Sequence, residues 1–366
     1  MLSVPSACAR GGDGKTASPL PINPTPTSPG QVVVLAGNGE QKKPVDGAFA
    51  TRSPVYASGA IAAAPDGSIF TFADNGRNRT LVRIGSDGRV HVLPVLTPLA
   101  GRVVLAATRT GVWSMDTGEH ASLTRTALDG SGQTLVFGPA EGGPTSLTFV
   151  DAAGRLLPEA QRRTLLKRWK PSAMAVRDDG IPVVATEDGS LYEALGQGKL
   201  RPWTPAGYAD AVRKARTRQG TSGPSPIELS PSAIMPGRTG EVIVVGTGII
   251  HVPRRGEVKA TGFRVPHDVL WRWSGGVALN DGSLLLLETN IGRLLRVAAD
   301  GSLYRLPAFA TQICTDYKPV VGPSRRPDGT IALGSCGRLL GFRPPMPQGD
   351  EPMFPGYAPD QIPELP

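Results

Sequence analysis

The chain has 366 residues, of which 40% are hydrophobic and 5% aromatic, and its formal net charge is +8. The 46 glycines and 36 prolines favour many short strands joined by tight turns over long helices. No apolar run reaches the roughly 18 residues that a membrane-spanning helix needs, so the sequence given contains no such helix.

Residues 9–30 are rich in Pro, Ser, Thr and Gly and poor in bulky apolar side chains. Such a segment buries too little surface to offset the entropy of ordering, so residues 1–30 are predicted to be a flexible tether. The tether follows Ser6, Ala7 and Cys8, which resemble the end of a bacterial lipoprotein signal with Cys8 as its lipid-modified cysteine. Pro5 departs from that pattern, and no basic or apolar segment precedes it, so a chance match stays open as the alternative.

One sequence pattern occurs clearly in residues 59–93 and again in residues 276–306. It consists of an apolar strand, an Asp-Gly turn, an apolar strand, a polar loop, a strand carrying an arginine, a second Asp-Gly turn and a last strand. Asp-Gly suits a tight hairpin, because glycine adopts positive φ without penalty and aspartate tolerates it. Each copy therefore predicts a four-stranded antiparallel meander.

Weaker copies follow at residues 103–130, 173–192, 232–245 and 326–340, which makes six in all. The irregular residues 146–156 leave a seventh copy as the alternative. One meander exposes two apolar faces, and radial stacking of the copies buries both. We therefore expect a monomeric, all-β protein whose residues 31–345 form a six-bladed β-propeller, followed by a Pro-rich tail at residues 346–366.

Two segments between the copies have helical patterns, residues 158–169 and 208–218. They lie in a region, residues 160–220, that carries twelve lysines and arginines against six acidic residues. The candidate basic surface consists of Arg162, Arg163, Lys167, Arg168, Arg213, Lys214 and Arg216. Such a surface can attract nucleic acid, anionic lipid or an anionic polymer. Solvated helix faces are the preferred explanation, because no nucleic-acid motif accompanies the charge.

The two clear copies resemble NHL repeats. The resemblance rests on residues 31–39, on Asp46-Gly47, and on Ala73-Asp74 followed by Asn78. It implies a six-bladed propeller in which Val32 to Leu35 complete the last blade and close the ring. The low aromatic content and the missing Trp-Asp signature disfavour the WD-repeat class.

If Cys8 carries lipid, Cys314 and Cys336 remain as a pair in the last repeat. A disulfide between them fits an oxidising compartment, and two buried free thiols are the alternative.

Polar residues that follow the second strand of three copies are the candidate metal ligands: Asp74, Asn75, Glu187, Asp188, Glu288 and Asn290. Their oxygen atoms suit Ca²⁺, which is the one cofactor we consider, although no bound cofactor is the primary expectation. In NHL-type blades the residues corresponding to Asp74 and Asn78 instead hold their own loop through hydrogen bonds to the backbone.

The sequence has no GxSxG elbow, HExxH motif or glycine-rich phosphate loop. We therefore expect an extracytoplasmic binding protein, secreted or held at the cell surface by lipid, with a protein, glycan or anionic polymer as partner and without evident catalysis. The alternative is a metal-dependent hydrolase or lyase of the gluconolactonase-like propeller type, an analogy of fold only. A cytoplasmic RNA-binding NHL domain explains the basic charge, but it leaves the tether and the paired cysteines without a role.

Overall fold

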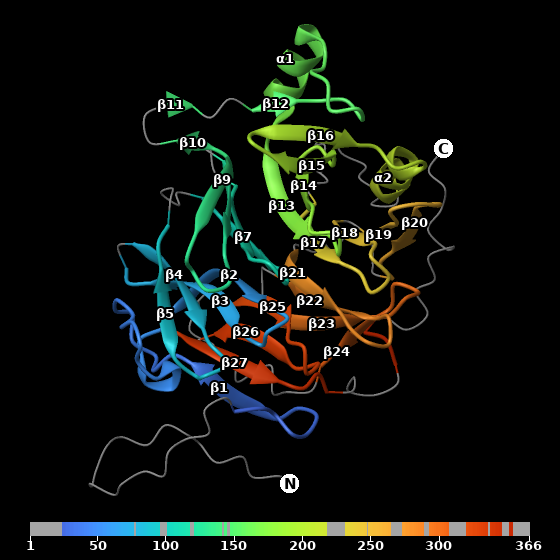
Figure 1. Ribbon diagram of the computed structural model, residues 1–366. Coiled ribbons are helices and arrows are strands. Elements are labelled where there is room, and N and C mark those ends of the chain that lie inside the picture. The colour runs from blue at the N-terminus through green and yellow to red at the C-terminus, as the bar shows by residue number, and fades with distance from the viewer. Residues whose placement is uncertain are drawn as a thin grey trace, which may run out of the picture.

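The computed structural model describes thirteen segments of the chain. They are residues 24–76, 78–95, 101–117, 121–140, 143–144, 147–217, 231–246, 248–264, 273–288, 293–306, 320–335, 337–345 and 351–353. Within them the chain forms six β-sheets arranged as the blades of a propeller (Figure 1). Cys8, Cys314, Cys336 and Asn290 lie outside the described residues, so the predicted lipid site and disulfide stay predictions.

Each of blades 1 to 3 has its first strand at the channel and its fourth at the rim. Blade 1 contains β2 (Ala57–Ala63), β3 (Ile69–Asp74), β4 (Arg79–Ile84) and β5 (Val90–Leu93). Blade 2 contains β6 (Val103–Ala107), β7 (Val112–Asp116), β8 (Ser122–Thr126) and β9 (Gln133–Phe137). Blade 3 contains β13 (Pro171–Val176), β14 (Pro182–Thr186), β15 (Leu191–Gly196) and β16 (Lys199–Trp203).

Blades 4 and 5 repeat this order, and blade 6 takes its rim strand from the other end of the chain. Blade 4 contains β17 (Ala233–Pro236), β18 (Val242–Val245), β19 (Gly248–Val252) and β20 (Lys259–Gly262). Blade 5 contains β21 (Trp273–Ala278), β22 (Leu284–Glu288), β23 (Arg293–Val297) and β24 (Leu303–Arg305). Blade 6 contains β25 (Val321–Arg325), β26 (Ile331–Ser335), β27 (Arg338–Phe342) and β1 (Val32–Ala36).

The six predicted copies each form one blade, and the predicted closing strand is confirmed. Val32 pairs with Phe342 and Val34 with Leu340, so β1 lies antiparallel beside β27. Within the predicted stretch 146–156, the described residues 147–156 do not form a seventh blade. Instead β12 (Thr148–Phe149) adds to blade 3 by pairing in parallel with β16. Minor elements are η1 (Ala50–Arg52) and the small hairpin of β10 (Pro139–Ala140) and β11 (Gly143–Pro144).

The apolar core is divided into six clusters, one at each interface between neighbouring blades. Strand β13 shows why: Met174 packs toward blade 2, whereas Ala173 and Ala175 pack toward blade 4. Successive side chains of a strand point to opposite faces, so every blade contributes to two interfaces. This is the physical reason that no blade is stable alone and that the ring has to close.

The hairpin turns use the aspartate of each Asp-Gly pair in the same way. The carboxylate of Asp281 accepts a hydrogen bond from the backbone N–H of Ser283 at 3.1 Å, and Asp328 accepts one from Thr330 at 2.9 Å. The glycine between them has positive φ, +85° at Gly282, which a β-carbon would strain. Where Ser or Thr follows the glycine, its hydroxyl donates a second hydrogen bond to the aspartate, as Ser283 and Thr330 do at 2.6 Å.

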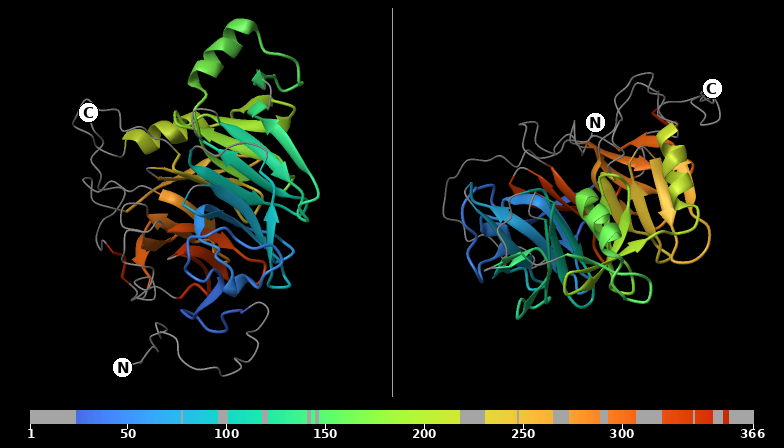
Figure 2. Two further views of the ribbon diagram at one scale, coloured as in Figure 1. Left: turned by 90° about the vertical axis from the view of Figure 1, so that its left-hand side faces the viewer. Right: turned by 90° about the horizontal axis from the view of Figure 1, so that it is seen from above.

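The two predicted helices are present, α1 (Glu159–Arg168) and α2 (Tyr208–Thr217). Helix α2 packs on β19 and β20, with Tyr208 and Ala211 buried. Helix α1 has no buried residue and projects beyond the strands, as the left-hand view of Figure 2 shows. Trp169, directly after α1, joins it to blades 2 and 3 through edge contacts with Phe137 and Tyr192 at 5.5 Å and 5.3 Å between ring centroids. None of the helices in the described segments is long and apolar enough to cross a membrane.

Ring closure makes a prediction about Leu35, which is 3% exposed and belongs to the cluster between blades 6 and 1. We expect Leu35→Ala to lower the free energy of unfolding by about 2–5 kcal/mol, because the truncation leaves a cavity at the closing interface. Lys43→Ala, at an exposed site nearby, is the control and is expected to change it by less than about 0.5 kcal/mol. Urea denaturation measures both, and equal effects would contradict a role of β1 in closure.

The turn aspartates predict acid sensitivity. Burial acts to raise the pKa of Asp328, but hydrogen bonds from Thr330 and the charge of Arg326 outweigh burial and lower this pKa from its ordinary value of 3.8. A carboxyl whose folded-state pKa is depressed stabilises the fold above its unfolded pKa and loses that contribution as the pH falls through the folded value. We expect the melting temperature of Asp328→Asn to lie below that of the parent protein at pH 7, with the gap shrinking below about pH 4. A gap that stays constant from pH 7 to pH 3 would contradict this assignment.

Candidate functional site

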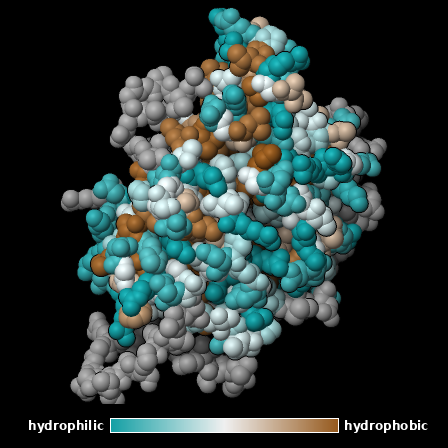
Figure 3. All heavy atoms as spheres, viewed as in Figure 1, coloured by the Kyte–Doolittle hydropathy of each residue, from teal (hydrophilic) through white to brown (hydrophobic). Residues whose placement is uncertain are grey.

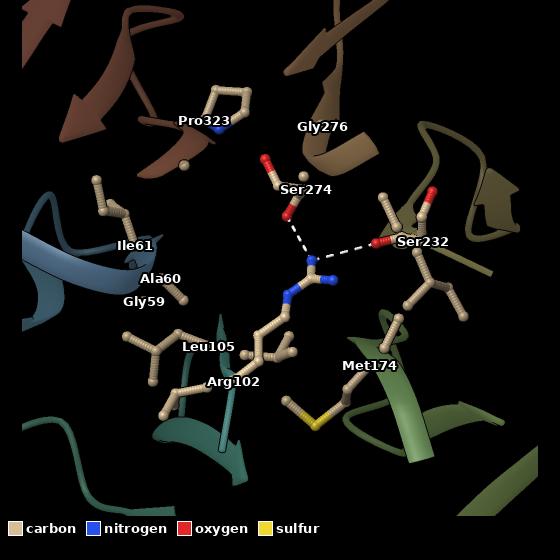
Figure 4. A pocket seen from close by; sticks show the side chains of 17 residues that line it. Gly59, Ala60, Ile61, Arg102, Leu105, Met174, Ser232, Ser274, Gly276 and Pro323 are labelled. Atoms are coloured by element: carbon tan, nitrogen blue, oxygen red, sulfur yellow. Dashed lines mark hydrogen bonds between the residues drawn. The ribbon is translucent and has the colours of Figure 1, made fainter. Parts of the chain in front are cut away.

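The candidate site lies in the central channel, at the end where the inner strands begin. The six inner strands β2, β6, β13, β17, β21 and β25 contact one another in sequence, and β25 contacts β2. Between them is a cavity of about 80 Å³ whose lining includes Gly59, Met174, Ser232, Gly276 and Pro323 (Figure 4). The lining consists of glycine, serine and aliphatic residues of the inner strands together with Arg102.

Four of the six inner strands are irregular at this end, whereas β6 and β17 pair regularly with their second strands. The pairing of β2 with β3 shifts register between Ser58 and Ile61, and that of β21 with β22 shifts between Trp273 and Gly275. Strands β13 and β25 have corresponding shifts, after Pro171 and after Val321. Residues inside a bulge have no cross-strand partner, so their peptide groups are free to face the channel. Irregular backbone thus lines the mouth of the channel at blades 1, 3, 5 and 6.

Serines recur at the same end of the blades. The hydroxyl of Ser172 donates to Ala185 O at 3.2 Å and also to Pro231 O at 3.1 Å, which connects blade 3 to the start of blade 4. Ser58, Ser232 and Ser274 likewise donate to a carbonyl of the second strand of their own blade, at 3.4–3.5 Å. These hydroxyls are therefore used to fix the strand ends.

Blade 2 has an arginine at this position, Arg102, directly before β6. Its side chain crosses the channel mouth, and Nη2 donates to Ser274 O at 2.7 Å and to Ser232 O at 3.2 Å (Figure 4). Both acceptors are neutral carbonyls of blades 5 and 4. The Arg102 side chain is exposed to solvent, and its guanidinium stays charged at neutral pH. The site therefore holds a positive charge that no carboxylate of the described residues neutralises.

The predicted metal ligands lie at this same end of the propeller, after the second strands, but the described ones mainly hold their own loops. Asp74 accepts a hydrogen bond from Gly76 N at 2.6 Å, and Asn75 accepts one from Asn78 N at 2.8 Å. Asp188 accepts from the Thr186 hydroxyl at 2.6 Å. These bonds match the loop-holding alternative that the sequence left open.

The other two described candidates are also engaged. Glu187 lies 3.7 Å from Lys170 Nζ, and Glu288 is buried at the end of β22, opposite Trp273. Among the described segments, no three His, Cys, Asp or Glu side chains come together as a metal site. The calcium site stays a prediction.

The predicted basic surface lies at the rim. Arg162, Arg163, Lys167 and Arg168 are on α1, which contacts β12 at the outer edge of blade 3. Arg213, Lys214 and Arg216 are on α2, beside the outer strands of blade 4, and their side chains are outside the described part of the structure. The α1 edge also exposes Leu156 and Leu166, and apolar surface gathers below the helix at the top of Figure 3. Charge and apolar surface thus meet at the rim rather than at the channel.

Sequence patterns missed Arg102 because blade 2 is the weakest copy. Its first hairpin turns at Thr110-Gly111 in place of Asp-Gly. Its position in the repeat could have revealed it. In blades 3, 4 and 5 a serine lies eight residues before the glycine of the first hairpin turn, and in blade 2 Arg102 lies close to the corresponding position.

Comparison with solved structures supports the propeller. A streptogramin B lyase is 16% identical, with a TM-score of 0.50 over 80% of this chain and 95% of its own. An auxiliary nutrient binding protein from Bacteroides ovatus is 8% identical, and a protein of unknown function from Bacteroides thetaiotaomicron is 11% identical. Both have a TM-score of 0.53, and both alignments cover 85% of this chain and 75% of the other chain. The shared property is the fold. No protein-family model matches the sequence, and no curated protein matches it.

Proposed function

We propose that this protein is a ligand-binding propeller without catalysis, and that it holds its ligand at the mouth of the central channel. The supporting observation is Arg102, a charged side chain that reaches across a mouth built otherwise from serine, glycine and aliphatic residues. Ligand pockets typically combine an apolar lining with a few placed polar groups, and this mouth has that composition.

The alternative, a metal-dependent hydrolase or lyase, fits this mouth less well. Such an enzyme would need a cation at the channel centre, where the guanidinium of Arg102 would repel it. In addition, Asp74 and Asp188 already accept hydrogen bonds from their own loops. The similar structures do not distinguish the two functions. One is a nutrient binding protein and another is a lyase, and the identity of both to this chain is too low to favour either function.

We further propose that the repeats are of the NHL type and that the protein acts outside the cytoplasm, anchored by lipid at Cys8. The support comes from the sequence: the likeness of residues 31–93 and 274–306 to NHL repeats, and the Ser6-Ala7-Cys8 sequence ahead of a Pro-rich tether. Lipid on one cysteine and a tether of this length would leave the propeller free to meet partners away from the membrane surface.

Binding at the mouth is tested by a thermal-shift panel of neutral and acidic oligosaccharides, peptides and small organic acids. A ligand that binds only the native state raises the melting temperature by mass action. Hydrogen exchange with the best ligand is expected to protect the strand starts of residues 101–105, 231–235 and 273–277.

A paired variant, Arg163→Glu with Lys167→Glu on α1, separates the mouth from the rim. We expect it to bind the ligand unchanged. Protection confined to α1 and the outer strands, or a melting temperature that rises with Ca²⁺ and no organic ligand, would contradict the proposal.

The anchor is tested by expressing the full chain with its native upstream sequence in a bacterial host. We expect the parent protein in the membrane fraction and Cys8→Ala in the soluble fraction, since the substitution removes the only atom that the lipid could modify. Cys314→Ala is the control and is expected to stay with the membrane. Equal partitioning of the parent and Cys8→Ala would contradict the anchor.

A further inference from the structure

Helix α1 exposes apolar side chains at the rim of blade 3. Leu166, in the second half of the helix, is 53% exposed, and Leu156, which precedes the helix, is 62% exposed. No residue of α1 is buried against the blades. Solvation explains the many basic residues of α1, but water gives no favourable surroundings to the leucines among them. The leucines therefore need a separate explanation.

The two leucines belong to a larger apolar surface below α1. Leu157 and Leu165, their neighbours in the chain, are half-buried and pack on the apolar cluster between blades 2 and 3. Trp169 is also half-buried and packs on the same cluster. Figure 3 shows apolar surface gathered below the helix. We call the surface formed by Leu156, Leu157, Leu165, Leu166 and Trp169 the α1 face. Shared apolar surface with a polar border is typical of a protein interaction site.

Positive charge borders the α1 face. Arg162 lies one helical turn before Leu166, so the two side chains are neighbours on the helix surface. The one acidic residue of α1, Glu159, pairs with Arg163. Among the described residues, no carboxylate pairs with Arg162 or Lys167. A partner that covers the leucines would therefore gain from carrying negative charge beside its apolar side chains.

We propose that the α1 face binds an acidic, amphipathic segment of a partner protein. Apolar side chains of the segment would cover Leu166 and the exposed parts of Leu165 and Trp169, and a carboxylate would pair with Arg162. Tryptophan and arginine are enriched among the residues that contribute most to binding at protein interfaces, and Arg162 and Trp169 lie about two turns apart on one side of the helix. The α1 face is separate from the channel mouth, so this inference does not depend on a ligand there.

A narrow peptide segment fits the α1 face better than a flat membrane or a second copy of the chain. Helix α1 projects beyond the strands in the left-hand view of Figure 2. A flat bilayer would meet this projection first and would not reach the half-buried side chains of Leu157 and Trp169 below it. Two copies that met through their α1 faces would bring Arg162 and Lys167 of both chains together, and like charges repel.

The test is fluorescence anisotropy with the full chain and a labelled helical peptide of about three turns, with Leu on one side and Glu on the other. We expect this peptide to bind at least about tenfold more tightly than the same peptide with Gln in place of Glu. Leu166→Asp is expected to weaken binding of the Glu peptide by about tenfold or more, because it places a carboxylate against an acidic segment. Arg162→Gln is expected to weaken it by about fivefold and to leave binding of the Gln peptide nearly unchanged.

Two control variants change the same residue types away from α1. Val45→Asp alters a side chain that is 59% exposed in the loop after β1, and Lys43→Gln removes an exposed positive charge from the same loop. Both are expected to bind the Glu peptide like the parent protein. Leu166→Asp is expected to melt at the same temperature as the parent protein, since Leu166 is exposed on a helix without buried residues, so weaker binding would not reflect unfolding.

Several results would overturn the proposal. Equal binding of the Glu and Gln peptides would overturn the acidic character of the partner. Leu166→Asp that binds the Glu peptide with full affinity would place the binding elsewhere. Vesicles of phosphatidylglycerol that bind the parent protein but not Leu166→Asp, without competition from the Glu peptide, would assign the α1 face to a membrane. A chain ending at Met353 that binds the peptide more tightly than the full chain would assign the face to residues 354–366 of this protein.

Discussion

The pairing of β1 with β27 is the constraint on which the rest of this structure depends. It connects the first strand of the propeller to the last blade and brings β25 against β2. Every blade buries two faces against two neighbours, so an open ring would expose the apolar sides of blades 1 and 6 together. The channel mouth depends on the same closure, because Arg102 belongs to blade 2 and its carbonyl acceptors belong to blades 4 and 5.

Local sequence signals accounted for most of the fold. The Asp-Gly turns located the hairpins because the turn itself uses the aspartate as a hydrogen-bond acceptor and the glycine for its positive φ, as at residues 281–283. Residues 146–156 were ambiguous because β12 joins blade 3 through a parallel pairing with β16, about fifty residues further along the chain, and no local pattern encodes such a partner. The site was less predictable for the same reason. The position of Arg102 before β6 could be seen in the sequence, but the carbonyls that hold it are more than a hundred residues away.

The channel and the rim offer two different kinds of surface. In this propeller most side chains of the strands pack between blades, and the channel is lined by glycine, serine and aliphatic residues with little chemical variety. A long side chain from a strand end, such as Arg102, is one of the few ways to place a charge there. The rim at α1 differs from the channel in its chemical variety. It carries many exposed side chains, including Arg163, Lys167 and Leu166, on a helix without buried residues. A small ligand fits the first surface, and a large partner would fit the second.

Closure by the two ends of the chain also bears on how this protein is made. Val32 and its partner Phe342 are separated by roughly 300 residues, so Val32 leaves the ribosome long before Phe342 is synthesised. At about 5–20 residues per second, the nascent strand waits on the order of 15–60 s for that partner. Throughout this time the sequence Val-Val-Val-Leu-Ala of β1 presents an unpaired, strongly apolar strand. The ring can therefore close only after the last blade has been synthesised, and until then β1 is exposed to unwanted pairing with other strands.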